Sequence, residues 1–292
     1  MMWAYAIKAK KVIATDVSSL HELQKLEKDA DWLWIDCFEP NPEEFQLVSE
    51  LLCIDEKILD DMKMGRAFPR YKKHNDCTLL SISVATIQNE LKTYPIYIGV
   101  KERLVMTTRK PGSSKPVERT IQTVKDCVEE MEKANPTFVV CEVLRETSNE
   151  NLEVMMALRE VIETVEEEAI ARPSRKALTK KVFALKREIA VLYRLLWSEE
   201  QMMSSLKDGL IPNLQPCEES VLGLEDAMDN ISRELEFLNS YDNALDGILR
   251  LQDLGMIHRV EKTLIYLTIA IVAMNLILIA MEIGILDLLL GL

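Results

Sequence analysis

The longest apolar run in the chain lies at 263–281, TLIYLTIAIVAMNLILIAM. As a helix that rises ~1.5 Å per residue, it is long enough to cross the ~30 Å hydrocarbon core of a bilayer. A buried core helix is the alternative, but the run is too long and too close to the chain end to favour it. The pattern therefore predicts a transmembrane helix at 263–283 that follows a water-soluble body.

The charges on the two sides of this run differ in sign. His258, Arg259 and Lys262 precede it, whereas Glu282 and Asp287 follow it. Because basic residues stay on the cytoplasmic side, we expect the body to be cytoplasmic, at a cell (inner or plasma) membrane. The tail at 284–292 is too short to return across the bilayer.

The pattern over residues 1–135 alternates between short strands and helices. Runs rich in Val, Ile, Thr and aromatic residues predict strands at 3–7, 11–15, 32–37, 78–87, 94–100 and 104–108. Helices are expected at 18–28 with Ser18 or Ser19 as cap, after Asn41 and Pro42, and around 58–61. This alternation predicts an α/β domain.

Strand patterns disappear after residue 115, and helical patterns replace them. Helices are expected at 117–133, from Pro136 towards Ala171, from Arg175 to about Leu206, and from about Cys217 to Met281. The segment 136–215 reads as an antiparallel helical pair and 216–262 as a stalk helix. Apolar residues in the stalk recur at alternating steps of four and three, broken only by Asp242: Leu224, Met228, Ile231, Leu235, Leu238, Leu245 and Leu249. Such a seam is buried either by the two preceding helices, in an intramolecular bundle, or by other copies, in a homo-oligomeric stalk.

Composition restricts the function classes. The chain has 292 residues and a formal net charge of -13, from 48 acidic and 35 basic residues. An acidic body disfavours nucleic acid, whose binding relies on Lys and Arg, and is compatible with cations. The six cysteines contain no CxxC pair and only three His are present, so a zinc site and an oxidising compartment are not indicated. The sequence shows neither a nucleophile–base pattern nor a phosphate-binding loop, so it does not indicate an enzyme.

A polar stripe runs along the predicted membrane helix. Glu261, Thr268, Asn275 and Glu282 are spaced seven residues apart, which places them on one helix face. The same stripe contains Leu264, Val272 and Ile279. A polar stripe is costly against lipid but favourable if several copies turn it inwards around water, where carboxylate rings attract cations. The alternative is that Asn275 and Thr268 only bond a neighbouring helix, while both Glu residues face water at the interfaces.

The order of elements resembles the CorA family of divalent-cation channels. The matching segments are WLWID at 32–36, NPEE at 41–44, ILDD at 58–61 followed by Pro69, RLVMTT at 103–108 and VEKTL at 260–264. The resemblance implies a homopentamer that has a cytoplasmic α/β domain, a funnel of long helices and a pore lined by the first membrane helix. It also implies a regulatory Mg²⁺ site between subunits at Asp60 or Asp61, completed by Glu225 or Asp226. Two or more carboxylates together with retained waters suit Mg²⁺, because this ion dehydrates reluctantly.

The chain also departs from the family pattern. The family ends its first membrane helix with Gly-Met-Asn, followed by a second helix and a basic tail; here Ala273-Met274-Asn275 lies about two turns too early. We expect a channel subunit that passes Mg²⁺, or else Co²⁺, Ni²⁺ or Zn²⁺, and that is closed by cytoplasmic Mg²⁺. The alternative is a membrane-tethered scaffold or Mg²⁺ sensor that does not transport.

Overall fold

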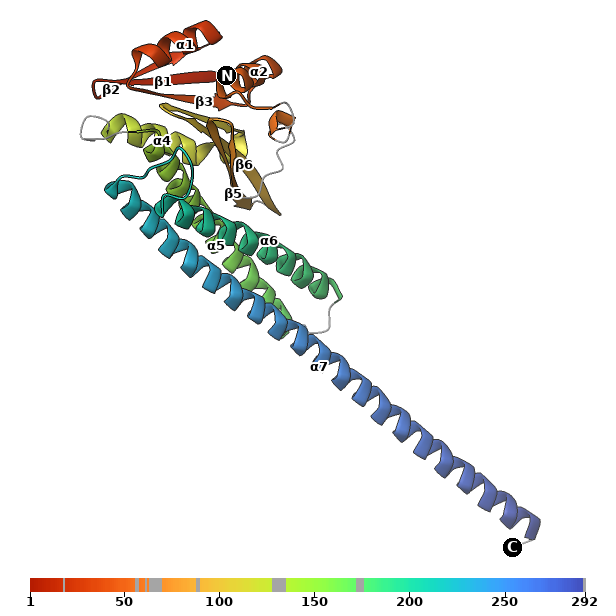
Figure 1. Ribbon diagram of the computed structural model, residues 1–292. Helices are drawn as coiled ribbons and strands as arrows, with labels where there is room; N and C mark the ends of the chain where they lie inside the picture. Colours follow the sequence, from red (N-terminus) through yellow and green to blue (C-terminus); the bar gives the residue numbers. More distant parts are fainter. Residues whose placement is uncertain are drawn as a thin grey trace. The chain divides into compact units, whose positions relative to one another are not determined.

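The computed structural model describes residues 1–17, 19–55, 58–60, 62, 70–87, 90–127, 135–171 and 176–290. The strands are β1 (Met2–Lys8), β2 (Lys11–Asp16), β3 (Trp32–Phe38), β4 (Arg70–His74), β5 (Cys77–Ile87), β6 (Leu91–Lys101) and β7 (Leu104–Arg109). The helices are α1 (Leu20–Asp29), α2 (Pro42–Leu52), the 3₁₀ turn η1 (Pro111–Ser113), α4 (Ser114–Cys127), α5 (Pro136–Ala171), α6 (Lys176–Lys207) and α7 (Glu218–Leu290). The expected fold class, an α/β domain followed by long helices and a membrane helix, is confirmed (Figure 1).

The strands form one mixed sheet in the order β2-β1-β3-β7-β6-β5-β4. Only β3 and β7 pair in parallel; the other neighbours pair antiparallel. The edge strand β4 is the one strand that the sequence pattern did not indicate, because RYKKH lacks the apolar alternation of a half-buried strand.

The two faces of the sheet are covered by different helices. Paired residues of β3 and β7 on one face, such as Ile35 and Met106, share a core with Leu52 of α2. On the other face, Arg109 of β7 bonds Glu118 of α4. The sheet is thus sandwiched between helices, as an α/β arrangement requires.

Local signals set the helix starts as expected. Asn41 caps α2 with a full capping box: its side chain accepts from the Glu44 N–H, and the Glu44 carboxylate accepts from the Asn41 N–H. Ser19 caps α1, whereas Ser18 lies outside the described residues. The expected helix at 117–133 is observed as α4, and its residues 128–134 lie outside the described ranges.

Two compact units divide the chain. The first comprises 1–161 and 187–241, and the second comprises 162–186 and 242–292. In the second unit, the start of α6 is tied to α7 by Lys186, whose Nζ lies 2.7 Å from Asp242 and 2.9 Å from Asp246. The domain boundaries expected from the sequence remain a prediction.

The seam of α7 is buried within a single chain. In the first unit Leu224, Ile231 and Leu238 are fully buried, and in the second Leu245 is fully buried. Helices of the same chain therefore cover these positions, which supports the intramolecular bundle. The helix also continues beyond the expected end at Met281, as far as Leu290.

Candidate functional site

The polar stripe lies on one uninterrupted helix. Among the described residues, α7 is the one helix long and apolar enough to cross a membrane, and its apolar stretch is exposed throughout. All seven stripe residues are exposed: Glu261, Leu264, Thr268, Val272, Asn275, Ile279 and Glu282. Since the helix is continuous, residues seven apart drift by only ~20° around it, so the stripe is one face.

The polar groups of the span differ in how they are bonded. The Thr268 hydroxyl donates to the Leu264 carbonyl at 2.9 Å, and the Thr263 hydroxyl donates to the Arg259 carbonyl at 2.9 Å. Glu261 lies 3.7 Å from His258 at the start of the span. Each threonine thus satisfies its own donor along the helix and leaves lone pairs that can face water or an ion.

The expected regulatory site is distributed over separate elements. Asp60 lies in a helical turn and is exposed, and Asp61 lies outside the described residues. Glu225 and Asp226 are exposed on α7, where Lys207 of α6 lies 3.2 Å from Glu225. Throughout the described ranges, no three His, Cys, Asp or Glu side chains come close enough to hold a metal ion. The predicted ligand set is untested.

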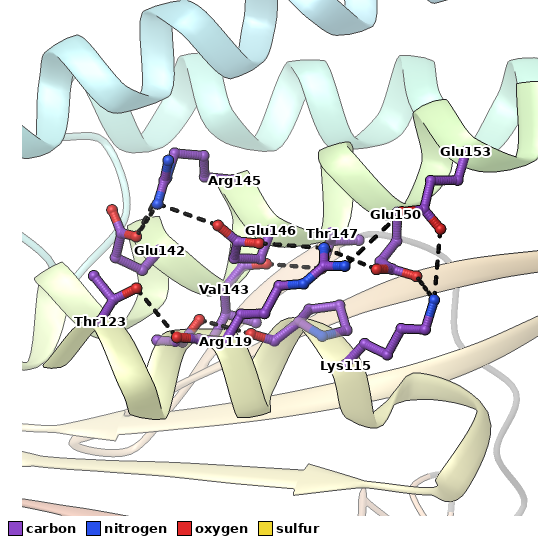
Figure 2. A network of polar contacts seen from close by, with 12 residues as sticks. Lys115, Arg119, Thr123, Glu142, Val143, Arg145, Glu146, Thr147, Glu150 and Glu153 are labelled. Atoms are coloured by element: carbon purple, nitrogen blue, oxygen red, sulfur yellow. Dashed lines mark hydrogen bonds and ion pairs between the residues drawn. The ribbon is translucent and has the colours of Figure 1, made fainter. Parts of the chain in front are cut away.

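A cluster of ion pairs lies elsewhere among the described residues, between α4 and α5, and sequence reasoning missed it. Figure 2 shows a ladder of glutamates on one face of α5, facing cations of α4: Glu142, Glu146, Glu150 and Glu153 with Lys115 and Arg119, and Arg145 beside them on α5. The spacing of Glu142, Glu146 and Glu150 at i, i+4 and i+8 is the signal that could have indicated it.

Arg119 is the centre of this ladder. Its Nη1 lies 2.8 Å from Glu150 and 3.5 Å from Glu146, two carboxylates that are more than nine-tenths buried. Lys115 Nζ lies 2.9 Å from Glu150, and this hydrogen bond raises the pKa of Lys115. Because these carboxylates are already compensated by cations, the ladder joins α4 to α5 and is not a site for Mg²⁺.

A second buried ion pair joins the sheet to α4. The Asp36 carboxylate accepts from Arg109 Nε at 3.1 Å and from Arg109 Nη2 at 2.9 Å, and it also accepts from the Thr107 hydroxyl at 2.8 Å. Arg109 Nη1 donates to Glu118 at 2.8 Å. Asp36 ends the WLWID segment and Arg109 follows RLVMTT, so the structure brings the two segments together in the parallel pair β3–β7.

Comparison with known proteins gives consistent results. The family described as "CorA-like Mg²⁺ transporter protein" matches residues 29–276. The cobalt/magnesium transport protein CorA of Methanocaldococcus jannaschii is 21% identical over 190 residues, which covers 63% of this chain and 58% of that protein. The chain thus matches little more than half the length of this relative.

The fold is similar to solved structures. The complete CorA magnesium transporter of M. jannaschii matches with a TM-score of 0.73 and 17% identity, over 92% of this chain and 81% of that chain. Its soluble domain matches with a TM-score of 0.68 and 17% identity, over 86% and 96%. The ZntB cytoplasmic domain from Vibrio parahaemolyticus matches with a TM-score of 0.59 and 12% identity, over 89% and 98%. Since the family match spans well over half of the chain and confirms the resemblance seen in the sequence, the chain belongs to the CorA-like Mg²⁺ transporter family.

Proposed function

We propose that this protein is a channel subunit that passes Mg²⁺, or a related divalent cation such as Co²⁺, across a membrane. The observation that carries the proposal is the polar stripe on a continuous, exposed membrane helix in a chain of this family. A single stripe cannot enclose water, so the function requires several copies, and the family resemblance suggests five. Asn275 and Thr268 would contact the ion's hydration shell, while Glu261 and Glu282 would concentrate cations at the two mouths.

The driving force is the membrane potential. Moving one charge through 100 mV is worth ~2.3 kcal/mol, so a divalent ion gains about twice that on entering an inside-negative compartment. The basic residues before the span support a cytoplasmic body, which places the Glu261 ring at the inner mouth.

Regulation by cytoplasmic Mg²⁺ is the finer part of the proposal. Asp60 or Asp61 of one subunit would bind Mg²⁺ together with Glu225 or Asp226 of the next, and carboxylate oxygens are the ligands that Mg²⁺ prefers. Among the described residues of one chain, no three such side chains come together, which agrees with a site that a second subunit completes. Lys207 would have to release Glu225 or share it with the ion. Losing Mg²⁺ would leave facing carboxylates unbalanced and favour opening.

The test is Mg²⁺ flux into proteoliposomes that contain the full chain. We expect Asn275→Leu to abolish flux and Thr268→Val to reduce it. Thr263→Val is the matched control, because its hydroxyl makes the same bond to a carbonyl one turn back but lies off the stripe. Oligomeric state is compared by chemical cross-linking, so that a disassembled variant is not counted as a blocked one.

Two outcomes would contradict the proposal. Equal loss in Thr263→Val and Thr268→Val would show that flux does not follow the stripe. Absence of flux from an intact wild-type oligomer would favour the non-transporting tethered sensor. The regulatory site is tested separately: Mg²⁺ should raise the melting temperature of the wild type, but raise it less in Asp226→Asn.

A further inference from the structure

Two carboxyl groups lie deep in the helical part of the first unit, away from every site described above. Glu199 of α6 has 0% of its surface exposed, and Glu234 of α7 has 1%. Among the described residues, both oxygens of Glu234 and Oε1 of Glu199 have no hydrogen-bond partner. Glu199 Oε2 accepts a hydrogen bond from Asn151 Nδ2 of α5 at 3.1 Å, and the backbone N–H of Ser83 in β5 also donates to the Glu199 carboxyl group.

The surroundings of this pair are apolar. One turn away on either helix lie buried residues: Leu195, Leu196, Met202 and Met203 on α6, and Ile231 and Leu238 on α7. The groups that act electrostatically on Glu199 are Glu234, the Ser83 N–H of β5 and Asn151.

The cations nearest in sequence are bonded elsewhere. Arg194 of α6 donates through Nε to the Ala190 carbonyl, and the Arg233 guanidinium donates to Asn230 and to the Asp229 carbonyl. On α5, Glu150 beside Asn151 is paired with Lys115 and Arg119. In the part of the chain that the structure describes, no cation is among the groups that shift the pKa of Glu199 or Glu234, so the two carboxyl groups are not part of a salt bridge there.

An ionised carboxylate in such a position has lost its water without gaining a compensating charge. Burial raises the pKa of Glu234 to about 8. Burial, and secondly the charge of Glu234, raise the pKa of Glu199 well above its ordinary value. Physical chemistry thus favours the neutral acids in the folded protein near pH 7.

We propose that Glu199 and Glu234 form a proton-binding site that holds α7 against α6 while both carboxyl groups are neutral. The site also reaches the sheet, because Asn151 donates to Glu199 through Nδ2 and accepts from the Ala85 N–H of β5 through Oδ1 at 3.1 Å. Loss of a proton to water leaves a carboxylate in the apolar layer, which weakens the packing of α7 on α6. Proton binding here does not require ion transport and does not depend on the proposed channel.

The direction of the pH effect follows from the two states. A glutamate in the unfolded chain is already ionised near pH 7, while the folded protein keeps the proton. The contribution of the pair is therefore complete at low pH, where both states are protonated, and it declines as the pH rises towards and through about 8. Between the ordinary pKa of a glutamate and about 8, each pH unit should raise the unfolding equilibrium constant up to about tenfold for each proton that only the folded state holds, and above about 8 this dependence should level off.

The experiment measures denaturant unfolding of the full chain in detergent at several pH values from 6 to 9. Glu234→Gln copies the neutral acid, so it should fold and show a much weaker loss of stability with rising pH. Glu236→Gln is the matched control, because Glu236 lies two residues away on the same helix and is exposed; it should retain the wild-type pH dependence.

A second measurement reads the proton directly. The infrared band of a protonated carboxyl group should be present in the wild type at neutral pH, decrease at alkaline pH, and be weaker in Glu234→Gln. The protection of backbone amides over 224–238 from hydrogen exchange, relative to their intrinsic rate at each pH, should decrease at alkaline pH in the wild type but not in Glu234→Gln. Identical pH profiles in wild type and Glu234→Gln, or no protonated carboxyl band that the substitution removes, would overturn the proposal.

Discussion

The ion pair between Asp36 and Arg109 allows a quantitative test of how β3 is held to β7, and Arg109 also links these strands to α4 through Glu118. Both side chains are buried, and Arg109 contacts Asp36 through two nitrogens and Glu118 through a third. Replacing one partner of a buried pair typically costs about 3–5 kcal/mol, because the other charge stays buried without compensation.

The structure predicts an order for the two single variants. In Asp36→Leu, Arg109 retains Glu118, which is half-exposed, so we expect the cost to lie near ~3 kcal/mol. In Arg109→Met, Asp36 retains the Thr107 hydroxyl as its bonded partner among the described residues, and a full charge stays buried, so the cost should lie near ~5 kcal/mol. The destabilisation of the double variant should be smaller than the sum of the two single effects, by about 2 kcal/mol or more.

The assay is urea unfolding of the full chain, followed by the fluorescence of tryptophan. Trp34 is a suitable reporter because it is fully buried and its indole donates to Thr107 at 3.1 Å, next to the pair. Simple addition of the two single effects would refute the coupling, and a more severe effect of Asp36→Leu than of Arg109→Met would refute the role assigned to Glu118.

Three further predictions concern other residues of the first unit. Arg119→Met should destabilise the chain by ~1–3 kcal/mol, which is less than the loss of a fully buried pair because Arg119 is partly exposed. The control Glu153→Gln, at the exposed end of the ladder, should cost below ~1 kcal/mol in the same unfolding assay. Cys53 ends α2 in a left-handed conformation with a φ of 52°, so Cys53→Gly should stabilise by up to ~1 kcal/mol, whereas Cys53→Val should destabilise. Among the cysteines of residues 1–127, Cys53 is exposed, whereas Cys77 is buried and burial raises its pKa to about 11. Maleimide should therefore modify Cys53 well before Cys77.

The features predicted most successfully from the sequence are those that local chemistry determines. The capping box at Asn41, the proline starts of α2 and α5, and the apolar length of α7 each depend on a few neighbouring residues, and each is observed. The family match and the similar solved structures confirm the fold class and the resemblance. The strand β4 was missed because its side chains are mostly charged and its pairing with β5 is decided by the rest of the sheet.

The contact between Asp36 and Arg109 and the burial of Glu199 and Glu234 could not be predicted, because each depends on residues distant in sequence. Asp36 meets Arg109 only after β3 and β7 pair, and Glu234 lies beside Glu199 only after α7 folds back on α6. In the sequence, Glu234 looks like an ordinary surface position, because the neighbouring Leu235 is the residue that belongs to the heptad seam. The stripe from Glu261 to Glu282 and the carboxylates at Asp60, Asp61, Glu225 and Asp226 depend on a second copy of the chain, so they remain predictions.

The two edges of the sheet restrict how copies of this protein can associate. The edge strand β4 presents Arg70, Lys72 and Lys73, and the turn between β1 and the other edge strand, β2, presents Lys10 and Lys11. An unpaired strand edge is a template for joining another chain, and charged residues of one sign make that joining unfavourable. Strand-to-strand aggregation is thereby discouraged in a chain that is otherwise acidic, which leaves helical surfaces as the favoured route to an ordered assembly.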